Sequence, residues 1–300
     1  MKIRKYAAID IGSNAIRLLV HNVLEQEQRE TQFHKDSLIR VPVRLGEDSF
    51  TKGRISNRNI ERMLHTMKAF NHLMEVMEVE SFRACATSAM REAINGREII
   101  ARILKETGVS IDLIDGREEA EIIAATDLKH LIREDQTYLY IDVGGGSTEF
   151  SLIRGGSIQD SQSFPIGTVR LLNQMVDDKI WQEVESWIQE KCRPIKKITI
   201  IGSGGNINKL HSMSGRREGE PLSYIWLNAQ YQFLKALTYE ARILELGLNP
   251  DRADVIIPAT RIYLLAAKWS SARKIFVPRI GLSDGIIKTL YKLHQESILK

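Results

Sequence analysis

Short apolar runs that end near glycine alternate along this chain with longer segments of helical periodicity. Residues 6–11 and 16–24 predict two strands, because apolar runs bounded by turn residues are typical of strands, and the turn Gly12-Ser13-Asn14 joins them. In residues 57–79 apolar side chains recur every three or four positions, which predicts a helix capped by Ser56. Strands that alternate with helices indicate an α/β fold.

The same rules predict the remaining elements. Strands are expected at 81–86, 110–114, 137–143, 148–154, 197–201 and 273–277, with strand and loop at 37–50. Helices are expected at 97–107, 117–132, 180–192, 227–246, 254–270 and 282–299, and one begins at Asn206.

One pattern occurs twice, about a domain length apart. Residues 9–14 and 141–147 each contain an apolar strand, an aspartate near its end and a glycine-led turn, and a second strand follows. The two aspartates, Asp10 and Asp142, are 132 positions apart. We therefore expect two similar α/β domains, 1–124 and 125–300, with the two turns on opposite walls of a cleft. Whether helix 282–299 packs on the first or the second domain stays open.

The two turns carry groups that suit a phosphate anion. Glycine lets the backbone approach a ligand closely, and successive N–H groups form an anion-binding nest. Ser13, Asn14, Ser147 and Thr148 add side-chain donors. A carboxylate at each strand end can hold magnesium against phosphate oxygens. The alternative for Asp10 and Asp142 is that they only stabilise the turns.

Two further segments offer anion ligands. Residues 202–205, Gly-Ser-Gly-Gly, stand between a strand and a helix, where the helix N-terminus favours anions. Thr87 and Ser88 open another helix after a strand and can donate hydroxyls, and Arg91 follows as a charged donor. The alternatives are ordinary glycine turn chemistry and a surface ion pair for Arg91.

Glu118 and Glu119 begin a helix between the two halves of the chain. Acidic residues in a first turn are favoured by the helix dipole, so helix capping is the simpler interpretation. A carboxylate at this junction can also orient and deprotonate a water for attack on a phosphoanhydride.

Composition and charge limit the cellular location and the binding partners that we expect. Among 300 residues the net charge is only +4, and the basic residues are scattered, so a small or polymeric anion suits the chain as well as a nucleic acid does. Cys85 and Cys192 lack metal-ligand spacing and are expected to be buried. We find no signal-peptide pattern and no apolar run long enough for a membrane span, so we expect a soluble, cytoplasmic protein.

Taken together, these motifs resemble the Ppx/GppA phosphatase family of exopolyphosphatases and guanosine pentaphosphate phosphohydrolases. The motifs occur in family order at residues 8–14, 43–46, 86–93, 118–120, 141–149, 165–171 and 202–205. The chain departs from the family at Ala15, where serine is frequent, and at Asn206, where threonine is frequent. It ends soon after its closing helix, so we expect the short two-domain form.

The resemblance implies two ribonuclease-H-like domains of the actin/hexokinase/Hsp70 type around an interdomain cleft. It implies magnesium-dependent hydrolysis of a terminal phosphoanhydride, with Mn²⁺ as a substitute for Mg²⁺. It also implies Glu119 as the water-activating base and Arg91 as a catalytic donor. The metal carboxylates would be Asp142, Asp10 and Glu149. The phosphate ligands would be Gly12, Ser13, Asn14, Arg17, Thr87, Ser88, Gly144, Gly145, Gly146, Ser147, Thr148, Gly202, Ser203, Gly204 and Gly205.

Other functions stay open at this point. A kinase of the same fold would need an adenine pocket and an acceptor site, and a sensor would bind an alarmone or polyphosphate without hydrolysis. A filament protein of the actin type is a third alternative. The choice between polyphosphate and guanosine pentaphosphate also stays open, and we expect no specific nucleic-acid partner. A homodimer is our expectation for the assembly.

Overall fold

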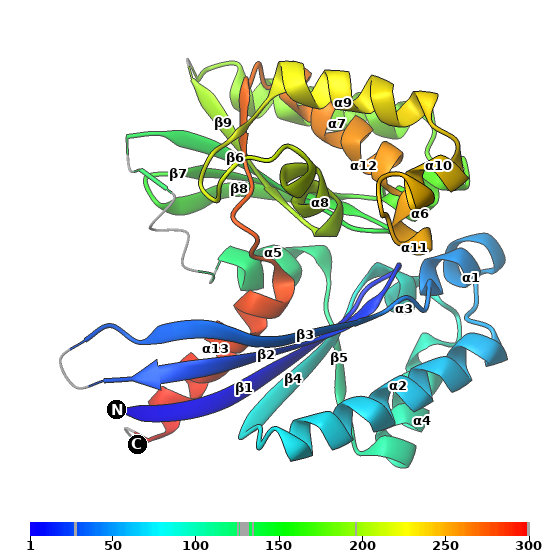
Figure 1. The fold of residues 1–300 in the computed structure, drawn as a ribbon, viewed down its shortest axis with the longest axis vertical. Helices are drawn as coiled ribbons and strands as arrows, with labels where there is room; N and C mark the ends of the chain where they lie inside the picture. The colour runs from blue at the N-terminus through cyan, green and yellow to red at the C-terminus, as the bar shows by residue number, and fades with distance from the viewer. Residues whose placement is uncertain (27–28, 125, 127–131, 134, 196, 299–300) are drawn as a thin grey trace. The chain divides into compact units, whose positions relative to one another are not determined.

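A computed structural model describes residues 1–300 except 27–28, 125, 127–131, 134, 196 and 299–300 (Figure 1). The chain divides into two compact units. Unit 1 contains residues 1–126 and 281–300, and unit 2 contains residues 127–280. Each unit is built around one mixed β-sheet.

The sheet of unit 1 has the order β3-β2-β1-β4-β5. Strands β3, β2 and β1 form an antiparallel meander. Strands β4 and β5 lie on the other side of β1 and run parallel to it. The residues 6–11 of β1 are all buried, as expected for the central strand of a covered sheet. The strands are β1 (Lys2–Ile11), β2 (Ile16–Glu25), β3 (Gln32–Val41), β4 (Ser81–Ala86) and β5 (Ile111–Leu113).

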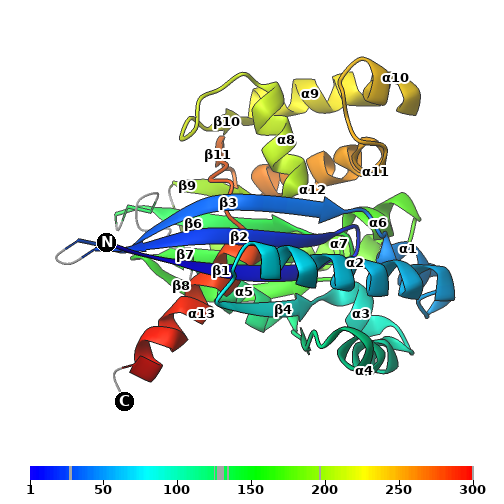
Figure 2. The same cartoon turned by 60° about the horizontal axis from the view of Figure 1, so that its bottom comes forward.

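Helices cover both faces of this sheet. Helices α2 and α4 share one face, where Arg102 of α4 donates to Glu61 of α2 at 2.8 Å, and α2 lies along the strands (Figure 2). The other face holds α5 and the closing helix α13, whose Tyr291 ring contacts Tyr6 of β1 at 5.8 Å between centroids (Figure 1). The helices are α1 (Leu45–Lys52), α2 (Asn57–Val76), α3 (Ser88–Glu92), α4 (Gly96–Thr107), α5 (Gly116–Ala124) and α13 (Leu282–Ile298).

The sheet of unit 2 has the order β10-β11-β9-β6-β7-β8. Its first three strands along the chain again form an antiparallel meander, and β9 and β11 run parallel to β6. The strands are β6 (Thr137–Val143), β7 (Thr148–Arg154), β8 (Ser157–Phe164), β9 (Ile198–Ser203), β10 (Leu222–Ser223) and β11 (Lys274–Phe276).

Aromatic side chains join the helices of unit 2 to its sheet. Trp187 of α7 packs on Phe150 and Phe164 of β7 and β8, with centroids 6.3 and 6.2 Å away. The buried Tyr263 hydroxyl of α12 donates to the Ser203 carbonyl of β9. The helices are α6 (Thr168–Leu172), α7 (Asp178–Cys192), α8 (Gly205–Met213), α9 (Tyr224–Ala236), α10 (Tyr239–Leu244), α11 (Pro250–Ala253) and α12 (Ile256–Trp269).

The two units share one topology. The order β3-β2-β1-β4-β5 of unit 1 recurs in unit 2 as β8-β7-β6-β9-β11. The predicted fold class, two ribonuclease-H-like α/β domains, is confirmed. Both cysteines are buried and unpaired, and burial raises the pKa of each thiol to about 12. No helix among the described residues is long and apolar enough to cross a membrane.

Several predicted elements were wrong in detail. The segment 37–50 is not strand and loop, because β3 already begins at Gln32 and residues 45–52 form α1. The strand expected at 197–201 continues to Ser203, so Gly204 alone separates it from α8. The single helix expected at 227–246 is two helices, since Thr238 is extended and its hydroxyl accepts from the Ala241 amide at 3.1 Å. The helix expected at 117–132 ends at Ala124 as α5, residues 126 and 132 are not helical, and residues 125 and 127–131 lie outside the described part of the chain.

Candidate functional site

The turn of unit 1 joins β1 to β2 in a narrow hairpin. The Gly12 amide donates to the Ala15 carbonyl at 3.1 Å, which closes the turn. Asp10 and Arg17 are cross-strand partners just outside it, and Arg17 donates to the Asp10 carboxylate at 2.8 Å. Asp10 is buried, so this ion pair keeps its charge compensated. The structure thus joins an expected metal carboxylate to an expected phosphate ligand.

Carbonyl groups of the same turn are held by the segment that leads into α1. The Arg44 amide donates to the Asn14 carbonyl at 3.0 Å, and the Gly46 amide donates to the Ser13 carbonyl at 2.8 Å. A Cβ on Gly46 would lie 3.0 Å from the Ser13 Cβ and 2.8 Å from the Phe50 ring, so glycine permits this approach. Because these carbonyls face α1, they do not repel an anion at the turn.

The β4–α3 junction lies beside this turn. The Ser13 and Ser88 hydroxyls are 3.0 Å apart and hydrogen-bonded, and the Thr87 amide donates to the Ile11 carbonyl at 3.2 Å. Arg91 donates to the Ile114 carbonyl at 2.7 Å, which ties α3 to the segment before α5. Two segments that were predicted separately as phosphate ligands therefore meet at one end of this sheet.

Helix α5 carries the expected base. Its N-terminal amides are capped by the Asp115 carboxylate, which accepts from the amides of Arg117 and Glu118 at 2.9 and 2.8 Å. Glu118 forms an ion pair with Arg83 at 3.0 Å. Glu119 is half-buried in the first turn. Asp115 therefore supplies the side-chain cap, while the helix dipole still favours a carboxylate at Glu119.

The turn of unit 2 repeats this geometry. The Gly144 amide donates to the Ser147 carbonyl at 3.0 Å, the same bond that Gly12 makes in unit 1. Asp142 and Glu149 are cross-strand partners at the positions that correspond to Asp10 and Arg17. A basic residue in unit 1 is thus replaced by a carboxylate in unit 2, and cross-strand partners stand on the same face of a sheet.

Carbonyls of this second turn are held by the start of α6. The Gly144 carbonyl accepts from the Thr168 amide at 3.0 Å, and the Gly145 carbonyl accepts from the Val169 amide at 2.8 Å. The Arg170 side chain donates to the Gly146 carbonyl at 2.7 Å. A Cβ on Gly167 would lie 2.2 Å from the Gly145 oxygen, so only glycine fits there.

Two further donors of the second turn are the amides of Gly145, which is partly exposed, and Gly146, which is buried. Within the described part of the chain, no hydrogen bond uses the amide hydrogens of Gly145 and Gly146. Their carbonyls are bound on the side of α6. Adjacent N–H groups in this state form the kind of nest that binds phosphate.

Glu149 is fixed by hydroxyl groups. It is buried, and one of its oxygens accepts from Ser147 at 2.7 Å and from Ser163 at 2.8 Å. The Thr148 hydroxyl donates instead to the Ile166 carbonyl, so the predicted ligand Thr148 joins β7 to the end of β8. The two serine hydroxyls thus fix the position of this carboxylate oxygen.

The segment 202–205 lies beside Asp142, but its members differ. Gly202 and Ser203 are buried in β9, where Gly202 allows close packing of Tyr263 and the Ser203 hydroxyl donates to the Ile280 carbonyl at 2.9 Å. Gly204 has φ +107°, and a Cβ there would lie 3.3 Å from an Asp142 oxygen. Gly205 begins α8. Ser203 is thus the ladder partner of Asp142, and Gly204 lies against the Asp142 carboxylate.

The carboxylates of unit 2 suit a magnesium ion held jointly with a substrate. No cluster of three His, Cys, Asp or Glu side chains occurs among the residues that the structure describes, so a complete protein cage is absent there. Mg²⁺ commonly takes one or two carboxylates and completes its shell with water and phosphate oxygens. Asp142 and Glu149, as cross-strand partners, fit that mode.

The residues that hold the turns lie within the motifs 43–46 and 165–171, where the sequence indicated no role for them. Arg44, Gly46, Gly167 and Arg170 bind or approach the turn backbones, although they follow the third strand of each unit rather than the turn itself. The available signal was a glycine shortly after each third strand, at Gly46 and Gly167.

Comparison with known proteins finds relatives of one family. The model of the Ppx/GppA phosphatase family matches residues 26–294. Exopolyphosphatase 1 of Mycobacterium tuberculosis is 24% identical and covers 98% of this chain and 89% of its own length. The bifunctional 3-dehydroquinate synthase/phosphatase of Fusobacterium nucleatum is 28% identical over 85% of this chain, which spans only 42% of that relative.

Solved structures have the same fold. The crystal structure of an exopolyphosphatase from Cytophaga hutchinsonii is 27% identical, with a TM-score of 0.85 over 98% of both chains. The Ppx/GppA family member of Aquifex aeolicus is 23% identical, with a TM-score of 0.77 over 98% of this chain and 99% of that one. The second similarity supports the fold alone.

Proposed function

We propose, since this chain belongs to the Ppx/GppA phosphatase family, that it hydrolyses the terminal phosphoanhydride of inorganic polyphosphate. One observation carries the proposal most directly. The turn at Gly144–Ser147 has its carbonyls bound on one side and two further donors in the amides of Gly145 and Gly146. The exopolyphosphatase relatives support the choice of substrate class.

Several of the expected residues have a chemical role in this proposal. The two glycine turns bind phosphate oxygens through backbone amides, and Arg91 stabilises charge on the transferred phosphoryl group. Glu119 orients a water and accepts its proton during attack on the terminal phosphorus. Asp142 and Glu149 would hold magnesium. The bound ion would neutralise charge on the phosphate oxygens and so favour attack by hydroxide or a polarised water.

Guanosine pentaphosphate is the second substrate that we propose to test. It presents the same terminal phosphoanhydride as a polyphosphate chain, so the turns and Glu119 would serve both. The nucleoside would need contacts outside the turns, so the rates of phosphate release from the two substrates separate them.

A phosphate-release assay tests the proposed function. Tripolyphosphate, long-chain polyphosphate, guanosine pentaphosphate and ATP are each incubated with the protein and Mg²⁺, Mn²⁺ or excess EDTA. We expect phosphate release from polyphosphate with Mg²⁺ or Mn²⁺ and none with EDTA. Tight substrate binding without release would favour a sensor instead. Phosphoryl transfer from ATP to an added acceptor would favour a kinase.

A further inference from the structure

The segment before α1 is held in a conformation that needs support. Arg44 has φ 60°, in the left-handed region that non-glycine residues seldom adopt. Its amide donates to the Asn14 carbonyl, and two residues later Gly46 donates to Ser13. The phosphate-binding turn of unit 1 therefore depends on the placement of residues 42–46, which the turn itself does not fix.

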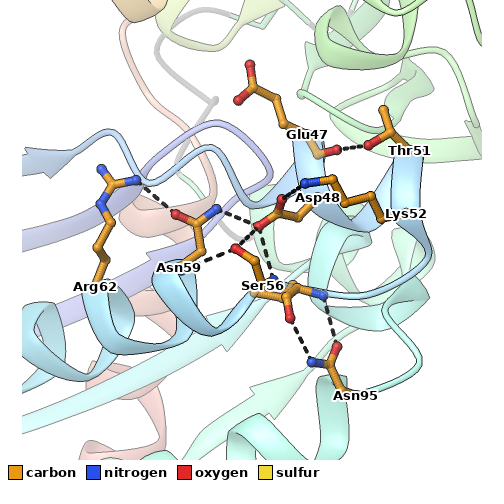
Figure 3. A network of polar contacts seen from close by, with 9 residues as sticks. Glu47, Asp48, Thr51, Lys52, Ser56, Asn59, Arg62 and Asn95 are labelled. Atoms are coloured by element: carbon orange, nitrogen blue, oxygen red, sulfur yellow. Dashed lines mark hydrogen bonds and ion pairs between the residues drawn. The ribbon is translucent and has the colours of Figure 1, made fainter.

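A polar network fastens this segment to α2. Arg62 of α2 donates to the Pro42 carbonyl at 2.7 Å and to the Val43 carbonyl at 3.0 Å. It also donates to the Asn59 side-chain oxygen at 2.9 Å, and the Asn59 amide group donates in turn to the Asp48 carboxylate at 2.8 Å (Figure 3). Asp48 belongs to α1, so both ends of the Pro42–Asp48 stretch are tied to α2.

The network is anchored at a buried carboxylate. Asp48 is 7% exposed and also accepts from the amide of Ser56 at 3.1 Å, from its hydroxyl, and from Lys52 at 3.2 Å (Figure 3). Asn95 adds a second clamp, since its side chain exchanges two hydrogen bonds with the backbone of Ile55, at 3.0 and 2.9 Å. The start of α2, from which Arg62 projects, is thus tied to α1 and to the N-cap of α4.

We infer that Asn59 and Arg62, anchored by Asp48, are positioning residues for the phosphate-binding turn Gly12–Ala15. They act without touching the substrate. They hold Arg44 and Gly46 so that the Ser13 and Asn14 carbonyls stay bound and the turn keeps the shape that accepts an anion. Only the expected effect on KM rests on the proposed function. The hydrogen bonds from Arg62 and Asn59 to the segment 42–48 lie within unit 1 and do not depend on it.

A purely electrostatic role and a purely stabilising role make different predictions from a positioning role. If Arg62 only attracts a polyanion, its charge matters and Arg62→Lys retains the wild-type KM. If the network only stabilises unit 1, its loss lowers the temperature of unfolding and the fraction of active protein, which lowers kcat and leaves KM unchanged. A positioning role requires higher KM in Asn59→Ala, where no charge changes.

Steady-state kinetics with tripolyphosphate and Mg²⁺ provide the first test. Loss of ground-state and transition-state binding together raises KM without changing kcat, so we expect KM about 3- to 10-fold higher in Asn59→Ala and Arg62→Ala, with kcat within about twofold. Arg62→Lys keeps the charge but cannot reach three acceptors, so its KM should lie near that of Arg62→Ala. The matched control is Arg102→Ala, which removes an arginine of unit 1 and its ion pairs with Glu61 and Glu106 but no hydrogen bond to residues 42–46.

Residue-resolved amide hydrogen exchange provides a second test that needs no activity. The Arg44 and Gly46 amides should exchange at least about tenfold faster in Asn59→Ala and Arg62→Ala than in the wild type or Arg102→Ala. Unchanged exchange would overturn the inference, and so would faster exchange with an unchanged KM. If the wild type releases no phosphate at all, the proposed function fails, while exchange still decides whether the network holds the segment.

Discussion

Glu119 stands in the first turn of α5, where two neighbouring carboxylates cap the helix and form an ion pair. Asp115 caps α5 and Glu118 pairs with Arg83. We expect Glu119→Gln to lower kcat at least about 100-fold, because general bases contribute about 10²- to 10⁴-fold to rate, while tripolyphosphate still raises the unfolding temperature. Phosphate release and thermal unfolding measure the two effects. Glu118→Gln is the control and should keep near-normal turnover. Near-normal turnover in Glu119→Gln would show that Glu119 is not the base.

Asp48 links the charge of a single residue to the stability of unit 1. Burial alone would raise the pKa of its carboxyl, but hydrogen bonds from Ser56, Asn59 and Lys52 outweigh burial and lower the pKa. A lowered folded-state pKa stabilises the fold above the unfolded pKa of about 3.9, and this stability is lost as pH falls through the folded value. Asp48→Asn should therefore lower the free energy of unfolding by about 1–3 kcal/mol at pH 7.

Urea unfolding at pH 7, 5, 4 and 3 checks this dependence. The difference between wild type and Asp48→Asn should shrink as the pH falls below about 4, because the unfolded wild type then binds a proton that the folded carboxylate, with its lowered pKa, still excludes. Asp112→Asn is the control, since Asp112 is about half exposed in its ion pair with Arg83 and exposed pairs contribute little. A difference that stays constant across this pH range would contradict the assignment.

At the scale of elements, each glycine turn is shaped by the short helix that follows the third strand. In unit 2 the residue before α6, Gly167, packs directly on the turn. A Cβ on Gly167 would lie 2.2 Å from the Gly145 oxygen and 2.4 Å from the Gly146 nitrogen. Gly167→Ala must therefore displace α6 or the turn, and we expect kcat/KM to fall by about 100-fold, as for a displacement of about 1 Å in a catalytic site.

The control for this change is a glycine of the same unit with open surroundings. Gly155, in the hairpin between β7 and β8, has φ +58°, and a Cβ added there would have no atom within 4 Å. Gly155→Ala should cost about 1–2 kcal/mol of stability through left-handed strain and leave kcat/KM unchanged. Phosphate-release kinetics of Gly167→Ala and Gly155→Ala test this expectation. Equal kcat/KM in the two variants would show that α6 does not shape the site.

Elements with strong local signals were predictable from sequence, and elements fixed by tertiary contacts were not. The β1–β2 and β6–β7 hairpins follow from apolar runs around Gly12 and Gly144. Helix α1 escaped notice because it begins after Arg44, a left-handed residue without a side-chain cap, and is only eight residues long. The positions of Gly46 and Gly167 have meaning only once the third strand brings them to the turns, a contact that no local pattern encodes.

At the scale of the whole molecule, the duplication is the feature that sequence revealed best. The spacing of 132 positions that separates Asp10 from Asp142 also relates Gly12 to Gly144 and Arg17 to Glu149, and each pair occupies matching places in the two hairpins. The exchange of Arg17 for Glu149 marks where the two halves differ chemically. The sequence could not show that Arg17 neutralises the charge of Asp10 while Glu149 adds a second carboxylate beside Asp142. These cross-strand neighbours are set by the register of the strands, which only the structure shows.

The division of the chain also predicts which part folds alone. Unit 2 is one continuous segment, 127–280, with its own sheet and core, whereas unit 1 needs residues 281–300 to cover β1 through Tyr291. We expect segment 127–280 to unfold cooperatively by circular dichroism when expressed alone. Segment 1–126 should be insoluble or molten, because the apolar face under α13 is exposed, and joining residues 281–300 to it through a flexible linker should restore cooperative unfolding. Cooperative unfolding of 1–126 without that addition would show that α13 is dispensable for unit 1.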